Sequence, residues 1–190
     1  MNPLNLDFPK EVGLFRKIIN DNTDFEKYWG GLHHSQCAYM SVYGFRAVKP
    51  NGRRAEYNTA IMKHFVLDFD KKYRKGSNMI DVEGDEVVEQ VRRLHNYLLD
   101  TDVNHGVWFS GNGFHLWISL DKTHLPSSGR EVSHLKAAGK KVINEWKKDM
   151  DLYCMDPTVP FDTARMIRVP NSYNAKQHVL RWSIPMTTEE

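Results

Sequence analysis

Hydrophobic and polar positions follow no single period in residues 1–60. Within this stretch, the apolar residues of 9–20 recur at helical spacing and predict a helix. Residues 23–26 resemble the capped start of a second short helix. Residues 37–46 alternate in a strand-like way, and Pro50-Asn51-Gly52 supplies a turn. The pattern therefore predicts a small α/β module at the beginning of the chain.

The pattern becomes more regular in the second part of the chain. Residues 64–70 form a short apolar run that ends in acids, which predicts a strand that emerges at a surface. Residues 106–109 and 115–120 predict two strands, and the tight turn Gly111-Asn112-Gly113 joins them into a hairpin. A last short strand is expected at residues 165–169.

Two amphipathic helices are predicted between these strands, at residues 85–99 and 131–150. The residues expected to point inward are Val88, Val91, Leu94 and Leu98 in the first helix and Leu135, Ala138, Val142 and Trp146 in the second. An extra strand is expected at residues 179–184.

Residues 63–170 thus give the order β-α-β-β-α-β, the split βαβ or ferredoxin-like plan that RRM modules and polymerase palms share. We therefore expect an α+β fold in which an RRM-like, palm-type module at residues 61–185 packs with the module at 1–60. Residues 186–190 are expected to form a tail. Because this plan hosts many functions, the side chains must decide the chemistry.

Composition narrows the class of protein only in part. The chain has 190 residues, of which 41% are hydrophobic, and this is enough for one sizeable core. Lys and Arg number 26 against 24 Asp and Glu, so attraction for nucleic acid requires a local basic surface. Two cysteines supply neither a disulfide framework nor a four-ligand zinc site. No apolar run is long enough to span a membrane, and a cytoplasmic protein is expected.

Two carboxylates at the end of the predicted acidic strand are the first candidate for chemistry. Residues two apart on a strand point to the same face, so Asp68 and Asp70 aim at one spot. Their repulsion falls when a cation lies between them, and Mg²⁺ or Mn²⁺ prefers such hard oxygen ligands. The alternative for this short motif is a pair of acids that simply face water.

The hairpin adds donors suited to a triphosphate. In the predicted plan the first and third strands are central neighbours, so His115 is expected beside the acidic pair. Ser110 offers a hydroxyl, and the glycines around Asn112 let backbone N–H groups approach a ligand. The alternatives are a satisfied sheet histidine and an ordinary turn.

A third segment supplies more acids and then arginines. Asp156 and Asp162 precede Arg165 and Arg168, whose charged forks suit phosphate oxygens, and Ser172 follows a proline. The two arginines have an alternative role in surface ion pairs.

Together, the three segments resemble the motifs of the archaeo-eukaryotic primase superfamily. The family pattern is a hydrophobic strand ending in Asp-x-Asp, a Ser-Gly-x-Gly-x-His hairpin, and Asp-x-x-Val followed by Arg-x-x-Arg-x-Pro-x-Ser. This chain has them in order as Leu67-Asp68-Phe69-Asp70, Ser110-Gly111-Asn112-Gly113-Phe114-His115, and Asp156-Pro157-Thr158-Val159 through Arg165-Met166-Ile167-Arg168-Val169-Pro170-Asn171-Ser172. The resemblance spans residues 38–175, without the zinc-binding insertion of many relatives.

The resemblance implies a template-dependent nucleotidyltransferase, a DNA primase or polymerase, that uses two Mg²⁺ or Mn²⁺ ions. Asp68, Asp70 and Asp156 are then the catalytic metal ligands, with Asp156 chosen over Asp162 because of the Asp-x-x-Val spacing. The implied nucleotide-binding residues are Ser110, Gly111, Asn112, Gly113, His115, Arg165, Arg168 and Ser172. The implied partners are NTPs or dNTPs, single-stranded DNA template and a helicase or accessory subunit, with no membrane.

Several basic residues are candidates for contacts with a template, and two other functions are compatible with parts of the sequence. Basic residues that could contact a template are Arg46, Arg53, Arg54, Lys71, Lys72 and Arg74, although a solvated surface explains charge runs more cheaply. A non-catalytic RRM-like RNA-binding module would use Phe65 and Phe69 for stacking, but it explains the acids poorly. A metal-dependent nuclease would use the acids but has less need of triphosphate donors.

Overall fold

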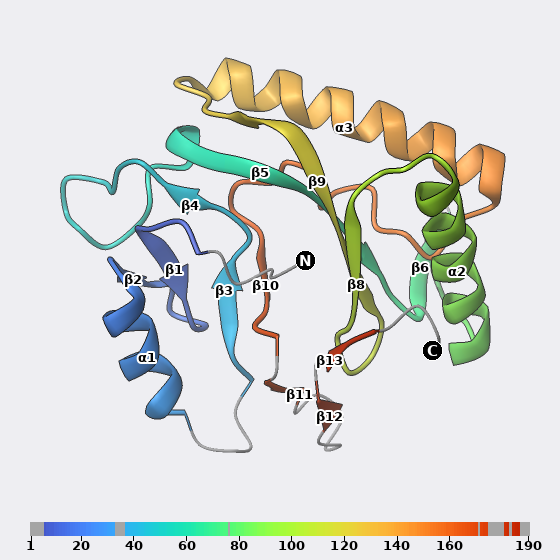
Figure 1. Ribbon diagram of the computed structural model, residues 1–190, viewed down its shortest axis with the longest axis horizontal. Helices are drawn as coiled ribbons and strands as arrows, with labels where there is room; N and C mark the ends of the chain where they lie inside the picture. Colours follow the sequence, from blue (N-terminus) through green and yellow to red (C-terminus); the bar gives the residue numbers. More distant parts are fainter. Residues whose placement is uncertain are drawn as a thin grey trace.

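The computed structural model describes residues 6–32, 37–75, 77–170, 172–174, 181–182 and 184–186. Two antiparallel sheets lie next to each other, and two long helices cover the larger one (Figure 1). The smaller sheet has the order β10-β3-β1-β2, and the larger has the order β13-β8-β9-β5-β4. The chain is therefore a mixed α/β protein, and none of its described helices is long and apolar enough to cross a membrane.

The helix predicted at residues 9–20 is wrong, because this segment is a β-hairpin. β1 (Lys10–Val12) pairs with β2 (Lys17–Ile19), and Val12 also pairs with Met40 of β3 (Tyr39–Ser41). Gly13, with φ of +72°, begins the turn, and its N–H donates to Tyr39 O at 2.8 Å. Tertiary pairing with β3 outweighs helical spacing here, and Phe15 in the turn is 93% exposed.

The second short helix is confirmed as α1 (Asn22–Gly30). Its cap is Asp21, whose side chain accepts from Asp24 N at 2.8 Å. The strand-like stretch that follows gives β3 and β4 (Gly44–Phe45), and the turn at Gly52 precedes a short 3₁₀ helix, η1 (Tyr57–Thr59).

The larger sheet is built around the predicted acidic strand. β5 (Ala60–Phe69) pairs antiparallel with β9 (Phe114–His124), and β9 pairs with β8 (His105–Phe109). The predicted hairpin and the predicted adjacency of the first and third strands are therefore confirmed. β13 (Ile184–Pro185) begins at the last residue of the stretch predicted to hold an extra strand, and it extends the sheet next to β8.

The RRM-like plan is not confirmed, because its fourth strand lies in the other sheet. β10 (Met166–Arg168) pairs with β3 instead of β5. The free edge of β5 is already taken by β4 at its beginning and by Met155, which bridges Phe69, at its end. The two modules predicted at 1–60 and 61–185 thus exchange strands, and the boundary between them stays a prediction.

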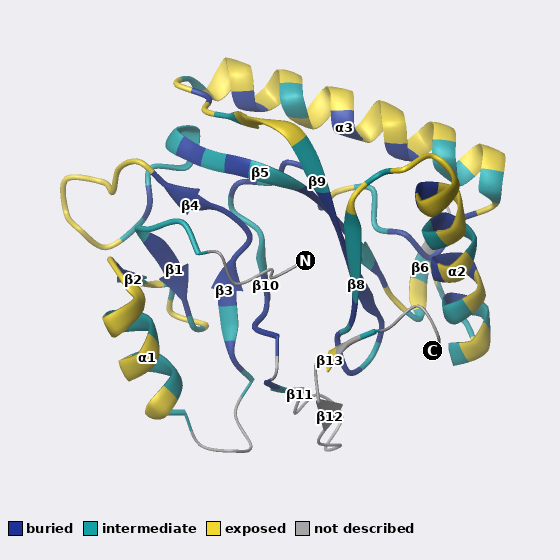
Figure 2. Cartoon of the chain, viewed as in Figure 1, coloured by how far each residue is buried: buried dark blue, intermediate teal, exposed yellow. Residues whose placement is uncertain are grey.

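α2 (Gly84–Asp100) and α3 (Gly129–Met150) pack on the larger sheet. Phe65 of β5 contacts Trp146 of α3, with ring centroids 6.1 Å apart. In α3 the predicted inward residues Ala138 and Val142 are exposed, and this part of the prediction is wrong. The buried residues of α3 are Val132, Gly139 and Ile143, and its outer face is exposed (Figure 2).

The position of Gly139 explains why α3 turns a different face to the sheet from the one predicted by its sequence. A Cβ built on Gly139 would lie 3.0 Å from side-chain atoms of both Phe65 and Phe161. Since no larger residue fits there without rearrangement, the helix approaches the sheet along its smallest side chain.

Two small hairpins complete the described chain. β6 (Lys72–Lys75) pairs with β7 (Asn78–Asp81), and β11 (Tyr173–Asn174) pairs with β12 (Arg181–Trp182). Of the predicted tail only Met186 is described, and residues 187–190 lie outside the described residues.

A buried lysine lies in the smaller sheet. Lys10 is 3% exposed, and its ammonium donates to Val42 O at 3.2 Å. Burial lowers the pKa of Lys10 from 10.5 to about 7, against a smaller opposing effect of Asp7. Between these two pKa values the unfolded chain binds more protons than the folded chain, so stability rises as pH rises from about 7 toward 10.5.

We expect Lys10→Met to raise the free energy of unfolding at pH 7 and to flatten its rise between pH 7 and 10, because a buried charge is removed. Each 1 kcal/mol gained raises the melting temperature by about 2–4 °C in a chain of this size. Thermal unfolding at several pH values checks this. Lys17→Met, at an exposed lysine of β2, serves as control, and an unchanged pH slope in Lys10→Met would contradict the prediction.

Candidate active site

The candidate residues meet in one row across the end of β5. Asp68 pairs with His115 of β9 on one side. On its other side, the Phe69–Met155 bridge places Asp68 opposite Asp156. Directly opposed residues of antiparallel strands project to the same face, so this register brings three distant segments to one face of the sheet.

Two main-chain hydrogen bonds fix the acidic side of this row. Asp156 N donates to Asp68 O at 2.8 Å, and Asp70 N donates to Cys154 O at 3.2 Å. Asp70 lies one residue beyond β5 and is exposed, whereas the side chain of Asp68 is 21% exposed. The backbones of Asp68, Asp70 and Asp156 are therefore neighbours, and Asp68 and Asp70 remain accessible from solvent.

Arg165 lies between two acids of the third segment. Its Nη2 is 3.5 Å from Asp156 Oδ2, and its Nε is 3.7 Å from Asp162 Oδ2. Asp156 Oδ1 also accepts from the N–H and hydroxyl of Thr158 at 2.8 and 2.7 Å. Asp162 Oδ1 accepts from Lys136 Nζ at 2.8 Å. Asp162 is thus already paired with two cations, while Asp156 faces one.

His115 is a neutral imidazole next to Asp68. It is 8% exposed, and its Nε2 is 3.7 Å from Asp68 Oδ1. Burial, and to a smaller extent the charges of Arg168 and Arg165, lower the pKa of His115 from 6.5 to about 3. At neutral pH the ring can therefore donate or accept a hydrogen bond, but it carries no charge.

The turn between β8 and β9 is packed directly on the acidic strand. Ser110 N donates to Gly113 O at 2.8 Å, and Gly113 N donates to Ser110 Oγ at 3.2 Å. Gly111 has φ of +87°, which favours glycine. A Cβ built on Gly113 would overlap the carbonyl oxygen of Phe69, so only glycine fits between the turn and β5. Asn112, between the glycines, is half-buried.

Arg168 joins the two sheets. It is 6% exposed, and its Nη1 donates to the carbonyl oxygen of Ser110. Its Nη2 donates to Tyr39 Oη at 3.3 Å, and its guanidinium lies 5.5 Å from the centre of the Tyr39 ring. The Nε atoms of Arg165 and Arg168 are buried without a hydrogen-bond partner. Ser172 is buried, and its hydroxyl donates to Val169 O at 2.6 Å.

The acids have the chemistry of a Mg²⁺ or Mn²⁺ site, because carboxylate oxygens are the preferred ligands of both ions. In the described ranges, however, no three His, Cys, Asp or Glu side chains are grouped closely enough to hold a metal. Asp156 points toward Thr158 and Arg165 instead. Asp68 and Asp70 thus have the oxygen ligands that such an ion prefers, while the carboxylate of Asp156 would have to turn away from Arg165 to join them.

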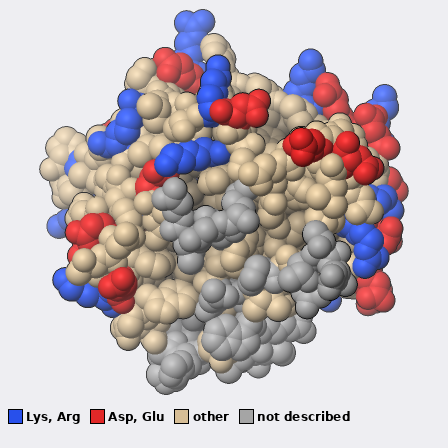
Figure 3. Space-filling view, viewed as in Figure 1, with Lys and Arg blue, Asp and Glu red and all other residues tan. Residues whose placement is uncertain are grey.

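The basic residues considered for template binding form two separate groups. Arg46, Arg53 and Arg54 belong to the segment between β4 and η1, whereas Lys72 and Arg74 belong to β6 and Lys71 precedes it; β4 and β6 lie on opposite sides of the molecule in Figure 1. Arg46 donates to the carbonyl oxygens of Leu125 and Pro126, and Lys72 pairs with Asp81 at 3.2 Å. The side chain of Arg74 lies outside the described residues. Figure 3 shows Lys and Arg mixed with Asp and Glu along the upper and right edges of this face.

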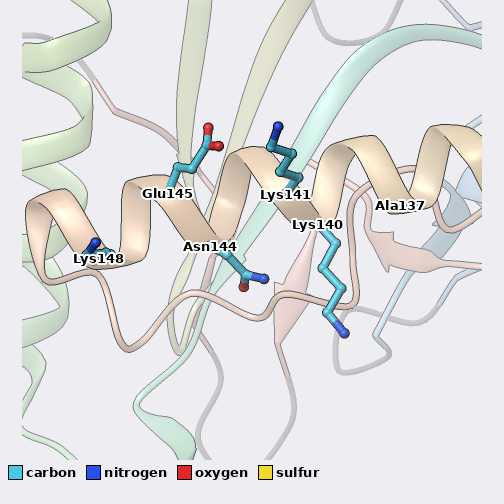
Figure 4. Close-up of a pocket in the computed structure, with 6 residues that line it drawn as sticks. All are labelled: Ala137, Lys140, Lys141, Asn144, Glu145 and Lys148. Carbon is cyan, nitrogen blue, oxygen red and sulfur yellow. The ribbon is translucent and has the colours of Figure 1, made fainter.

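A separate depression lies on α3, away from the row of acids. Its six lining residues, Ala137, Lys140, Lys141, Asn144, Glu145 and Lys148, all come from this one helix (Figure 4). The side chains of Lys140 and Lys141 point away from each other, so they do not converge on a ligand. This surface offers no counterpart to the chemistry at β5.

Two contacts of the site were missed by reasoning from the sequence. Tyr39 lies against Arg168, and Lys136 pairs with Asp162. Both partners come from distant segments, and neither is among the candidate site residues predicted from the sequence. Only the packing of β3 next to β10, and of α3 against the third segment, identifies them.

Comparison with solved structures finds a related fold. The chain is similar to the polymerase domain from Mycobacterium tuberculosis Ligase D in complex with DNA, with a TM-score of 0.59 and 16% sequence identity. The match covers 98% of this chain and 64% of that structure, so this chain spans less than two thirds of the neighbour's length. No family model matches the chain, and no curated protein matches it.

We expect Gly113→Ala to destabilise the protein by about 1–3 kcal/mol or more, because the added methyl group must push the turn away from β5. Denaturant unfolding monitored by tryptophan fluorescence measures this loss. Gly129→Ala is the matched control, since a Cβ at Gly129 meets nothing within 4 Å. Equal stability of the two variants would show that the turn is not tightly packed on β5.

Proposed function

We propose that this chain is a metal-dependent nucleotidyltransferase that joins nucleoside triphosphates on a nucleic-acid template, as members of the archaeo-eukaryotic primase superfamily do. The observation that carries the proposal is the row of Asp156, Asp68 and His115 across the end of β5. The fold similarity to a polymerase domain supports it, and so do the three ordered motifs.

The acids would provide the metal-binding half of the mechanism. Asp68 and Asp70 would hold Mg²⁺ or Mn²⁺, and main-chain pairing with Asp68 favours Asp156 over Asp162 as the third ligand. Two such ions supply charge neutralisation for in-line attack of a 3′-hydroxyl on the α-phosphorus, with pyrophosphate leaving. The contribution of the protein would be to hold the main chains of the three acids side by side before the substrate binds.

The opposite half of the row would contact the triphosphate. His115 can donate a hydrogen bond to a phosphate oxygen from its neutral ring, and Arg165 can add a charged fork when Asp156 turns to a metal ion. Arg168 has an unpartnered Nε, but its other nitrogens hold Ser110 and Tyr39. We therefore propose two roles for Arg168: it holds the β8–β9 hairpin through Ser110, and its charge adds positive potential near the triphosphate.

The structure gives less support to a non-catalytic RRM-like module. Phe65 and Phe69, the residues that would stack on bases, are 6% and 0% exposed. Phe65 lies against Trp146 and Phe161, within the core beneath α3. Neither ring is available to a nucleic acid without disruption of this packing, so base stacking on β5 is not favoured.

We expect Asp68→Ala and Asp70→Ala each to reduce nucleotide incorporation by at least about 100-fold, since loss of one metal-binding oxygen misplaces the reacting groups. The assay offers labelled nucleotides, Mn²⁺ or Mg²⁺ and single-stranded template, with and without primer, to the purified protein. The products also distinguish primase, polymerase and nuclease.

Asp121→Ala, at an exposed aspartate of β9, is the control for these variants. It should keep parental incorporation because it lies near the opposite end of the strand from His115. Full incorporation by Asp68→Ala and Asp70→Ala would refute the proposed function.

We expect His115→Ala to weaken triphosphate binding about tenfold to hundredfold, because a hydrogen bond to a charged group contributes about 1.5–3 kcal/mol. The measurement is the KM for the nucleotide, with direct nucleotide binding as a second readout. His134→Ala, at an exposed histidine of α3, is the control. An unchanged nucleotide affinity in His115→Ala would remove His115 from this role.

A further inference from the structure

The segment that carries Asp156 is held from behind by α2. Gln90 of α2 is completely buried, and its Oε1 accepts from Cys154 N at 2.9 Å. Its Nε2 donates to Cys154 Sγ at 3.2 Å and to Glu86 Oε1 at 3.1 Å. All the polar atoms of this buried amide are thus used, and two of its three contacts are to one residue of the acid-bearing segment.

α3 holds the same segment through a lysine. Lys147 Nζ donates to Met155 O at 2.7 Å and to Tyr153 O at 3.3 Å. Burial lowers the pKa of Lys147, and the nearby charge of Asp156 opposes this shift. The ammonium therefore combines two main-chain contacts with attraction toward the carboxylate of Asp156.

The other side of this segment pairs with β5. Cys154 O accepts from Asp70 N, and Asp156 N donates to Asp68 O. A continuous path therefore runs from Gln90 through the peptide units of Cys154 to Asp70. Because residues 154–156 form only an isolated bridge with β5, these two pairings have little support from a regular ladder.

We infer that Gln90 and Lys147 are positioning residues that keep Asp156 in register with Asp68 and Asp70 for metal binding. The inference rests on the proposed function. Three carboxylates that turn toward one metal ion also repel each other, so the segment of Asp156 would tend to move away from β5 unless other groups hold it. Gln90 and Lys147 hydrogen-bond to the main chain and to Cys154 Sγ of this segment, and not to the carboxylate of Asp156.

If Gln90 and Lys147 only supported the fold, their replacement would lower stability and metal binding together. Apolar residues of similar size at positions 90 and 147 would fill the same space, but they would leave Cys154 N and the carbonyls of Tyr153 and Met155 without these partners. Loss of positioning would therefore appear first in metal binding and turnover. The global fold should be affected less, because the hydrophobic core extends well beyond this segment.

The test uses the full chain and the variants Gln90→Leu, Lys147→Met and Lys147→Arg. Mn²⁺ binding is measured by electron paramagnetic resonance, and hydrogen exchange of the amides of Asp70 and Asp156 is measured without metal. Activity assays give kcat, the KM for triphosphate and the Mn²⁺ concentration for half-maximal rate. Lys140→Met is the charge control on an exposed position of α3, and Ile143→Val is the control for a small loss of core packing.

We expect Gln90→Leu and Lys147→Met to weaken Mn²⁺ binding and to lower kcat by about 10–100-fold, the usual effect of losing a residue that orients a metal ligand. The KM for triphosphate should change less than about twofold, since His115 and Arg165 are not held by this contact. Exchange of the Asp70 and Asp156 amides should accelerate, and Lys147→Arg should restore most of the loss because it keeps the donors.

Two failures are distinguishable. If the parent protein neither binds Mn²⁺ nor incorporates nucleotide, the proposed function is wrong, and the inference falls with it. If the parent binds Mn²⁺ but Gln90→Leu and Lys147→Met match it, or change no more than Ile143→Val, the proposed function stands and the positioning role is refuted.

Discussion

The site depends on one interaction, the pairing of residues 154–156 with the end of β5. Through two main-chain hydrogen bonds, it places Asp156 beside Asp68 and Cys154 beside Asp70. The same pairing occupies the edge of β5 where the fourth strand of a ferredoxin-like sheet would lie. This contact therefore brings the main chains of the acids together. It also leaves no room for β10 at this edge of β5, and β10 pairs with β3 in the other sheet.

The position of β10 has a direct electrostatic consequence. Because β10 belongs to the smaller sheet, Arg168 reaches across to the hairpin of the larger sheet, and Arg165 stands just before it at the acids. Positive groups thus approach the row of acids from the opposite sheet. They offset part of the repulsion among the carboxylates, and they add to the lowering of the His115 pKa that burial causes, so this end of the sheet combines carboxylate oxygens with uncharged and cationic donors.

The packing behind the sheet sets the limits of the site. Phe65 and Phe69 are buried on the helix-covered face of β5, while Asp68 lies between them in sequence and projects to the other face. Because side chains alternate along β5, its core residues lie on one face and the candidate active-site carboxylate lies on the other. Gly113 lets the hairpin approach the main chain of Phe69, and Gly139 lets α3 approach the ring of Phe65, so β5 is in close contact with both the hairpin and α3.

The sequence by itself determined the local elements: β5, the β8–β9 hairpin and α2. Each follows from a periodicity or turn signal within a few residues. Tertiary structure decided the rest. Residues 9–20 form a hairpin because β3 offers hydrogen bonds to Val12 and Gly13. α3 faces the sheet with Gly139, and not with the predicted residues Ala138 and Val142, because Gly139 fits against Phe65. The meeting of Asp156 with Asp68 required competition among distant segments for the same strand edge, and no local pattern encodes which segment wins that edge.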